Sequence, residues 1–308
     1  MSQIRSKIEA TFKSDDTEEI LDRYFYRPVG YGMAVVSRSI GITPNFVTIT
    51  SIFFGVLAGH LFFYQDTTIN LIGVFLLVTA EAMDSADGQL ARMTKIHSRY
   101  GKILDGVAGN LMFTSIYINL CIRYIVEGGT PFIFLIAIIA GFSHSLQSAM
   151  SEYYRNFYLF FVYGEGRSII DHLKDLKEKY KNLSWSKDTG KKILMWFYVD
   201  YTRKQEFLSK AIRNLYKYVY ERFNGFVPDW LRSEYRTLNK PLLKYGNILT
   251  TNTRMIFLFF TIFYANVFYY FLFEIIILNL LLLYFIFKHE STSKKLLQLV
   301  YSHSENQN

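Results

Sequence analysis

The sequence predicts an all-α, polytopic membrane protein with about six spanning helices. Hydrophobic residues make up 51% of the 308 residues, and aromatic residues make up 18%. Long apolar runs occupy residues 47–63, 69–83, 111–125, 131–142 and 255–287. A transmembrane helix needs about 20 mostly apolar residues, and several of these runs reach that length once their flanks are included.

The last apolar run is too long for a single crossing. As one helix it would measure about 50 Å, whereas a hydrocarbon core is about 30 Å thick. We therefore expect a hairpin of two spans that turns at residues 269–274, which places Glu274 in an outer loop.

Residues 1–43 are expected to form an N-terminal cytosolic segment with a helix at the membrane interface. Their charges are balanced, and apolar or aromatic side chains lie near the membrane entry at Ile20, Tyr24, Tyr26 and Val29. Thr43 and Pro44 then fit the cap and the first turn of the first span.

The rest of the chain divides into four segments by composition. We expect spans one to four in residues 44–162, a basic cytosolic insertion in 163–253, spans five and six in 254–288, and a cytosolic tail in 289–308. Residues 152–254 hold 20 basic and 11 acidic residues, an excess that suits anionic lipid headgroups. Nucleic acid is not an expected partner, because this tethered segment has no recognisable nucleic-acid-reading motif.

Within the insertion, one apolar series recurs at helical spacing beside Lys and Arg. It consists of Phe207, Ala211, Leu215, Val219 and Phe223. Two interpretations are equally open: an amphipathic helix at the membrane interface, or a solvated helix packed on the rest of the insertion.

The distribution of basic residues predicts the orientation. The candidate short loops 64–68 and 126–130 contain no Lys or Arg, whereas residues 92–102 contain four. Because basic residues stay on the cytosolic side, we expect both termini and residues 84–110 to face the cytosol. The expected location is a prokaryotic cytoplasmic membrane or a membrane of the endoplasmic-reticulum type.

An acidic stretch between the second and third runs carries the chemistry: DSADGQLARMTKIHSRYGKILDGVAGN, residues 84–110. On a helix, Asp84 and Asp87 share a face, and Asp105 on the next helix can meet them if the two spans pack as a hairpin. Three converging carboxylates repel one another unless a cation neutralises them. Mg²⁺ is usually held by a few carboxylates together with water and substrate phosphates. The alternative is that these aspartates cap helix ends or pair with nearby basic residues.

Small residues beside the aspartates leave room for a polar ligand. Gly88 and Ala91 allow it to approach the helix backbone, and Arg92 can bind a phosphate with two hydrogen bonds. The full pattern is Asp84-x-x-Asp87-Gly88-x-x-Ala91-Arg92, then eight residues, then Gly101-x-x-x-Asp105. It resembles the signature of the CDP-alcohol phosphotransferases, also called CDP-alcohol phosphatidyltransferases.

The resemblance implies a reaction in phospholipid synthesis. A substituted phosphate would pass from a CDP-linked alcohol to a hydroxyl acceptor, with release of CMP. One or two ions, Mg²⁺ or Mn²⁺, would be held by Asp84, Asp87 and Asp105, and the enzyme would be a homodimer. The residues implied to lie near the donor are Gly88, Ala91, Arg92 and Gly101.

The identity of the two alcohols is left open. The donor is CDP-diacylglycerol with a small polar acceptor, which we favour slightly, or CDP-choline or CDP-ethanolamine with a lipid alcohol. A polar series at helical spacing bears on the acceptor: His144, Gln147, Ser148, Ser151, Glu152 and Arg155. It would line an acceptor pocket or form hydrogen bonds between helices.

One position departs from the family pattern, which has a further aspartate four residues after Asp105 as general base. Here Gly109 occupies that position and Asn110 follows, and neither can accept a proton. Three explanations are open. The chain is an impaired relative that still binds a CDP-alcohol, or it uses another base such as Glu81 or His97, or the substitution was introduced to trap a substrate.

Overall fold

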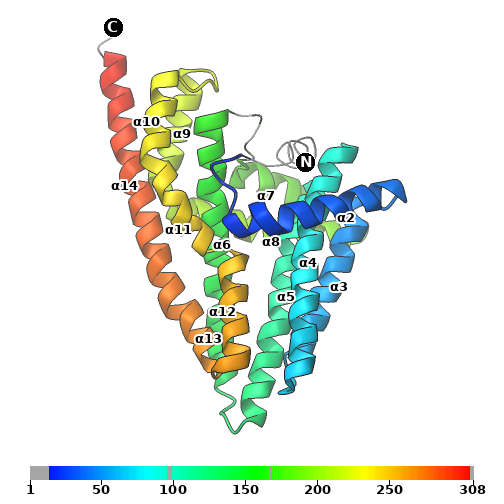
Figure 1. Ribbon diagram of the computed structural model, residues 1–308. Coiled ribbons are helices and arrows are strands. Elements are labelled where there is room, and N and C mark those ends of the chain that lie inside the picture. Colours follow the sequence, from blue (N-terminus) through cyan, green and yellow to red (C-terminus); the bar gives the residue numbers. More distant parts are fainter. Residues whose placement is uncertain (1–13, 96–98, 165, 167, 169, 306–308) are drawn as a thin grey trace. The chain divides into compact units, whose positions relative to one another are not determined.

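The computed structural model describes residues 14–95, 99–164, 166, 168 and 170–305, and over these residues it contains helices and no strands (Figure 1). The predicted all-α class is confirmed. Four stretches of the described residues are long and apolar enough to cross a membrane: α3 (Pro44–Leu61), α4 (Thr67–Thr94), α6 (Ile133–Tyr163) and Phe268–His303. The chain is thus an integral membrane protein, and six spans stay a prediction.

The chain divides into two compact units, each made from two stretches of sequence. Unit 1 comprises Met1–Ser143 and Arg254–Ile275, and unit 2 comprises His144–Thr253 and Ile276–Asn308. Helix α6 begins in the first unit and continues into the second without a break.

Unit 1 is built around α3. This helix begins at Pro44, as predicted, and packs against both α4 and α5 (Arg99–Val126). The helix α2 (Arg27–Ser39) follows a short π-helix, Asp22–Tyr26, and lies across one end of α4 (Figure 1). The remaining helices of this unit are α12 (Thr251–Tyr264) and α13 (Phe268–Leu272), followed by a π-helical turn at Phe273–Ile277.

Close backbone approaches fix the positions of α2 and α5. A Cβ atom at Gly59 of α3 would lie 2.7 Å from the backbone nitrogen of Ile116, so α5 packs there directly against α3. A Cβ atom at Gly30 of α2 would lie 3.0 Å from the Ser85 side chain on α4. The Gln89 side chain then donates a hydrogen bond to the Arg27 carbonyl at 3.1 Å. These contacts hold α5 against α3 and α2 against the motif-bearing end of α4, and α4 itself packs against α3.

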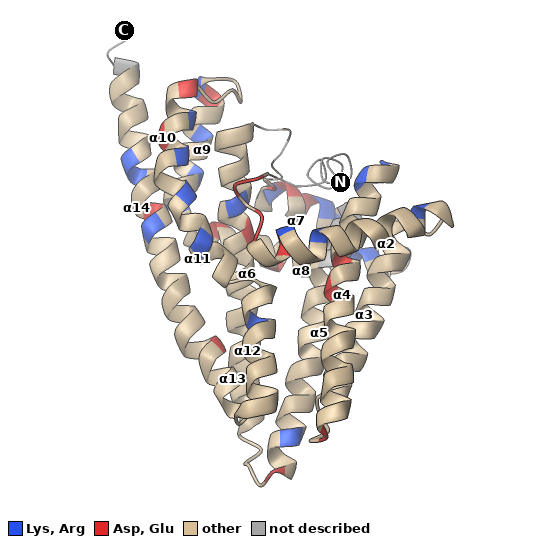
Figure 2. Cartoon of the chain, in the orientation of Figure 1, with Lys and Arg blue, Asp and Glu red and all other residues tan. Residues whose placement is uncertain are grey.

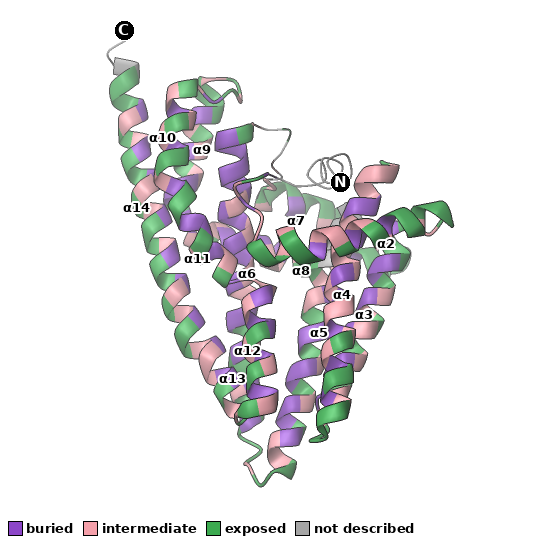
Figure 3. Ribbon diagram, viewed as in Figure 1, coloured by how far each residue is buried: buried purple, intermediate pink, exposed green. Residues whose placement is uncertain are grey.

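The core of unit 1 is apolar and aromatic, with Phe62, Leu120 and Tyr270 fully buried. Its outer helix faces are also apolar: Phe53 is 63% exposed and Phe75 is 68% exposed (Figure 3). Exposed apolar side chains on spanning helices suit a lipid environment, in which they need no protein partner.

The turn of the last hairpin lies earlier than residues 269–274, so that expectation is wrong. Helix α12 ends at Tyr264, and the Asn266 side chain accepts a hydrogen bond from the Phe268 backbone nitrogen at 2.8 Å, which starts α13. Glu274 is consequently not in a loop. It is fully buried and pairs with Arg254, also fully buried, with Oε1 and Nε 3.1 Å apart.

Unit 2 contains the predicted helical insertion. Its helices are α7 (Leu173–Asn182), α8 (Thr189–Leu208), α9 (Lys210–Arg222), α10 (Asp229–Asn239), a 3-10 turn at Lys240–Leu242, α11 (Leu243–Ile248) and α14 (Leu278–Glu305). Helices α9 and α10 pack along α14, which continues through residues 289–305. Ala211, Leu215 and Val219 are buried. Of the two interpretations of that apolar series, the structure shows the packed helix.

Candidate functional site

The two halves of the acidic motif lie on two helices of unit 1. Asp84, Asp87, Gly88, Ala91 and Arg92 occupy the last turns of α4, which ends at Lys95 with a left-handed φ of 56°. The remaining motif positions, Gly101, Asp105, Gly109 and Asn110, lie on α5. Figure 2 shows the acidic residues of α4 close to where α2 crosses it. The side chain of Asp105 and all of His97 lie outside the described residues.

Asp87 is held by a side chain from the neighbouring helix α3. The Thr48 hydroxyl donates a hydrogen bond to Asp87 Oδ2 at 2.5 Å, and Asp87 is only 6% exposed. A hydrogen bond from a hydroxyl on the neighbouring helix fixes the orientation of the carboxylate. Nothing in the sequence connects Thr48 with the motif, because the contact joins residues 39 positions apart.

We predict that Thr48→Val weakens metal binding and activity by about 10- to 100-fold, the usual effect of removing a partner that orients a metal ligand. The valine keeps the shape of the side chain, so the fold should be preserved. Thr50→Val is the matched control, because the exposed Thr50 hydroxyl only returns a hydrogen bond to Phe46 of its own helix. Titration of Mn²⁺ into both variants provides the measurement, and equal affinities would contradict the role given to Thr48.

Arg92 presents an unsatisfied guanidinium group. Its Nε and Nη2 atoms are buried and have no hydrogen-bond partner within the described part of the chain. A Cβ atom at Gly88 would lie 3.7 Å from Nη1 and from Nη2, so the guanidinium lies over this glycine. Buried donors without partners are costly, and a phosphate, like a carboxylate, can accept two parallel hydrogen bonds from a guanidinium. The site therefore fits a diphosphate group.

A second ion pair lies close to Arg92. Arg27 of α2 binds Glu18 through two hydrogen bonds, of 3.0 and 3.2 Å, and both residues lie within electrostatic range of Arg92. Because Glu18 already neutralises Arg27, the free donors of the cluster belong to Arg92. The pair was not predictable from the sequence, since it depends on how α2 crosses α4.

Glu81, a candidate substitute base, lies beside a buried phenol. Burial of Tyr26 and then the charge of Glu81 raise the pKa of the Tyr26 phenol above its usual range. Tyr26 consequently stays protonated at neutral pH and can act only as a donor or a neutral acceptor. The role of Glu81 as a base stays a prediction.

The position of the missing aspartate has room for a side chain. A Cβ atom at Gly109 would meet no described atom within 4 Å. Position 109 follows Asp105 by four residues and shares its helix face. Asn110 is exposed, and its amide donates to the Gly106 carbonyl of the same helix at 2.9 Å. The Asn110 side-chain amide therefore makes its hydrogen bond within its own helix.

The chemistry of the donor set fits a divalent cation. Carboxylates are the preferred ligands of Mg²⁺, and Asp84 and Asp87 lie on adjacent turns of α4. Among the described side chains, no group of three or more His, Cys, Asp or Glu residues could hold one ion. The third expected ligand, Asp105, is not among those side chains, so the complete metal site stays a prediction.

The polar series on α6 lies in unit 2, where several members bind neighbouring helices. Gln147 donates to Asn279 of α14 at 2.8 Å, Ser151 donates to the Gly246 carbonyl at 2.9 Å, and Arg155 donates to Asn247 at 3.3 Å. These bonds are of the interhelical kind. His144 is buried and Ser148 is half-buried, and their place in an acceptor pocket stays a prediction.

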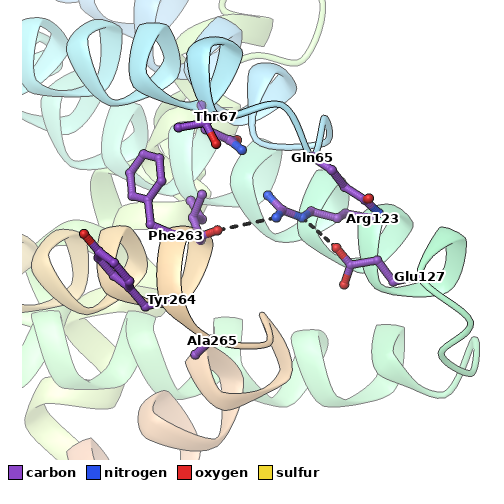
Figure 4. A pocket seen from close by; sticks show the side chains of 9 residues that line it. Gln65, Thr67, Arg123, Glu127, Phe263, Tyr264 and Ala265 are labelled. Carbon is purple, nitrogen blue, oxygen red and sulfur yellow. Dashed lines mark hydrogen bonds and ion pairs between the residues drawn. The ribbon is translucent and has the colours of Figure 1, made fainter.

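Unit 1 also has a polar cavity of about 390 Å³ at the opposite end of α4 and α5 from the motif (Figure 4). Its lining residues are Gln65, Thr67, Asn70, Arg123, Glu127, Ile262, Phe263, Tyr264 and Ala265. Arg123 is 8% exposed, lies 3.0 Å from Glu127, and donates to the Tyr64 and Ile262 carbonyls at 3.2 and 3.4 Å. This arginine links the ends of α3, α5 and α12, so a structural role explains its burial and no ligand is needed to pair it.

Comparisons with known proteins agree with the motif. The family model described as CDP-alcohol phosphatidyltransferase matches residues 41–155. The archaetidylinositol phosphate synthase of Pyrococcus horikoshii is 36% identical over 98 residues, which cover 32% of this chain and 50% of that relative. The match thus spans half the length of the relative. No solved structure matches the chain.

The matched region begins just before α3 and ends within α6, so it includes every motif position on α4 and α5. The resemblance predicted from these residues is confirmed. The part of the chain that carries the acidic motif, residues 41–155, matches the model of the CDP-alcohol phosphatidyltransferase family.

Proposed function

We propose that the protein is a CDP-alcohol phosphotransferase of phospholipid synthesis. It transfers a substituted phosphate from a CDP-alcohol to a hydroxyl acceptor and releases CMP. The observation that carries the proposal is the buried Arg92 guanidinium, whose unpaired donors lie next to the carboxylates of α4 inside the family-matched region. An arrangement of cationic donors and carboxylates is what a metal-bound diphosphate requires.

Each residue of the site has a role in this scheme. Mg²⁺ or Mn²⁺ bound by Asp84, Asp87 and Asp105 would neutralise charge on the diphosphate and on departing CMP. Arg92 binds a phosphate oxygen, and Thr48 holds Asp87 in its ligating orientation. Gly88 and Ala91 have the smallest side chains, which leaves space for the CDP-alcohol to reach Arg92.

The donor we favour is CDP-diacylglycerol, with a small polar alcohol as acceptor. A relative named for the synthesis of archaetidylinositol phosphate supports a polar acceptor. The runner-up is CDP-choline or CDP-ethanolamine with a lipid alcohol as acceptor. In both cases the substrates reside in or beside the membrane, and we propose a cytosolic active site in a homodimer.

The test is CMP release by the purified protein in lipid vesicles, with a panel of CDP-alcohols and acceptors. We expect release in at least one pairing, and loss of release when EDTA removes the metal. Asp84→Asn should also abolish release, while Asp66→Asn serves as the control, because it makes the same change at the opposite end of α4 and the asparagine oxygen can still cap the helix.

A second candidate function is CDP-alcohol binding without catalysis. Gly109 favours this candidate, because it lacks the carboxylate that the family uses as general base. Donor binding without CMP release in every pairing would establish it and contradict the transferase. A general base contributes about 10²- to 10⁴-fold in rate, so the assay must detect turnovers that are slower by that factor.

A further inference from the structure

We propose that α8 is an in-plane helix that inserts its aromatic face into the lipid headgroup and upper acyl-chain region of the membrane. The helix belongs to the insertion, which lies outside the family-matched region, so the inference is independent of the catalytic function. The proposed partner is the lipid bilayer itself.

Helix α8 has a buried side and an exposed side. One face is buried in unit 2 and consists of Lys192, Met195, Val199, Thr202 and Gln205. The other side of the helix carries large apolar side chains that remain exposed: Ile193, Trp196 and Phe197 are 43%, 53% and 48% exposed, and Phe207 is 84% exposed. The ion pair of Asp200 with Lys204, 2.8 Å apart, lies on the same side, between the Trp196–Phe197 pair and Phe207. In water such a group of side chains would be unfavourable, because large apolar side chains are stabilised by leaving water.

Helix α8 contacts the spanning helix α6 close to the end of the membrane-crossing length of α6. Gln205 is buried and its amide donates to the Ala149 carbonyl of α6 at 2.8 Å. Ala149 lies 16 residues after the start of α6 at Ile133, or about 24 Å along the helix. A hydrocarbon core is about 30 Å thick. The C-terminal part of α8 therefore meets α6 within a few ångström of the membrane border.

The composition of α7 and α8 also suits a membrane interface. Tryptophan is enriched at membrane interfaces, where its ring is apolar and its N–H remains near water. Trp196 packs edge-on against Phe197, and Trp185 is exposed just before the helix. Residues 173–208, which form α7 and α8, contain nine Lys and Arg and five Asp and Glu, a net charge of +4. This excess complements anionic headgroups.

The apolar series at 207–223 left an interfacial helix open as one interpretation. Most of the series lies on the packed helix α9, and the exposed apolar side chains lie on the preceding helix, α8. Phe207 is the first member of that sequence pattern. It lies on α8 and stays exposed, whereas Ala211 and Leu215 on α9 are buried.

The chain has three tryptophans, which allows a direct test in reconstituted vesicles. The first variant combines Trp185→Phe and Trp230→Phe and retains Trp196. The matched control combines Trp185→Phe and Trp196→Phe and retains Trp230, which stacks on His303 of α14 with ring centres 4.2 Å apart. Both variants are placed in vesicles that contain a phospholipid brominated in the upper acyl chain.

We expect brominated lipid to quench Trp196 at least about twofold more than Trp230, because the bromine quenches rings that reach the acyl chains. Two results would overturn the proposal. If aqueous acrylamide quenches Trp196 and brominated lipid does not, the face is solvated. If neither quencher reaches Trp196, the face is covered by protein, such as a second copy of the chain.

Discussion

Replacing Gly109 with aspartate is expected to raise the rate of CMP release by about 10²- to 10⁴-fold, the usual contribution of a positioned general base. The carboxylate would stand one helical turn after Asp105, where the family pattern has it. The site has room, since a Cβ atom at position 109 meets no described atom within 4 Å. The measurement is the single-turnover rate of CMP release with saturating donor.

Asn110→Asp is the matched control, because it places the same carboxylate one residue away. Five residues of helix turn the side chain away from the face of Asp105, and Asn110 is exposed and bonded to Gly106. We expect no gain from this variant. If neither variant gains activity while Glu81→Gln or His97→Asn loses it, the chain uses a substitute base and the vacancy at position 109 is not limiting.

Breaking the buried ion pair of unit 1 is expected to have the largest effect on stability. Arg254 and Glu274 are both fully buried, and the Tyr270 hydroxyl lies 3.2 Å from Glu274 Oε1. Glu274→Gln leaves a buried guanidinium without its counter-charge, which costs about 3–5 kcal/mol. At roughly 2–4 °C per kcal/mol for a chain of this size, we expect the unfolding midpoint in detergent to fall by about 10 °C.

Two further variants separate the ion pair from general effects of mutation. Glu221→Gln breaks the exposed pair with Lys217, whose side chains are 65% and 75% exposed, and should change the midpoint little. The double variant Arg254→Met with Glu274→Leu removes both charges and should recover most of the loss. A double variant as unstable as Glu274→Gln would show that shape, rather than charge, accounts for the effect.

The position of this ion pair shows what the sequence could and could not predict. The apolar run 255–287 correctly indicated a hairpin, but Glu274 was assigned to its turn because an isolated acidic residue usually marks a loop. Two signals were available. The first is Asn266, because asparagine often starts turns and helices. The second is that Arg254 and Glu274 are each ten residues from position 264. A hairpin that turns near position 264 therefore brings these two side chains to the same depth.

The residues of the candidate site also differ in whether the sequence could predict them. Asp84, Asp87, Gly88 and Arg92 could be identified from spacing within one helix, because local intervals decide which side chains share a face. Thr48 and the Arg27–Glu18 pair could not be identified. Thr48 reaches the motif because α3 packs against α4, and Arg27 reaches it because Gly30 lets α2 approach α4 closely. Such tertiary contacts leave no mark on local spacing.

The last turns of α6 determine where this protein can be truncated without the loss of buried contacts. The family match stops at residue 155, but α6 continues for two more turns to Tyr163. Phe157, Phe160 and Phe161 in those turns are fully buried, and the Phe161 ring stacks on Tyr235 of α10 with centres 4.3 Å apart. A minimal domain ending at the family boundary would lack these aromatic rings together with the insertion that packs on them. The insertion and the last turns of α6 therefore have to be kept or removed together.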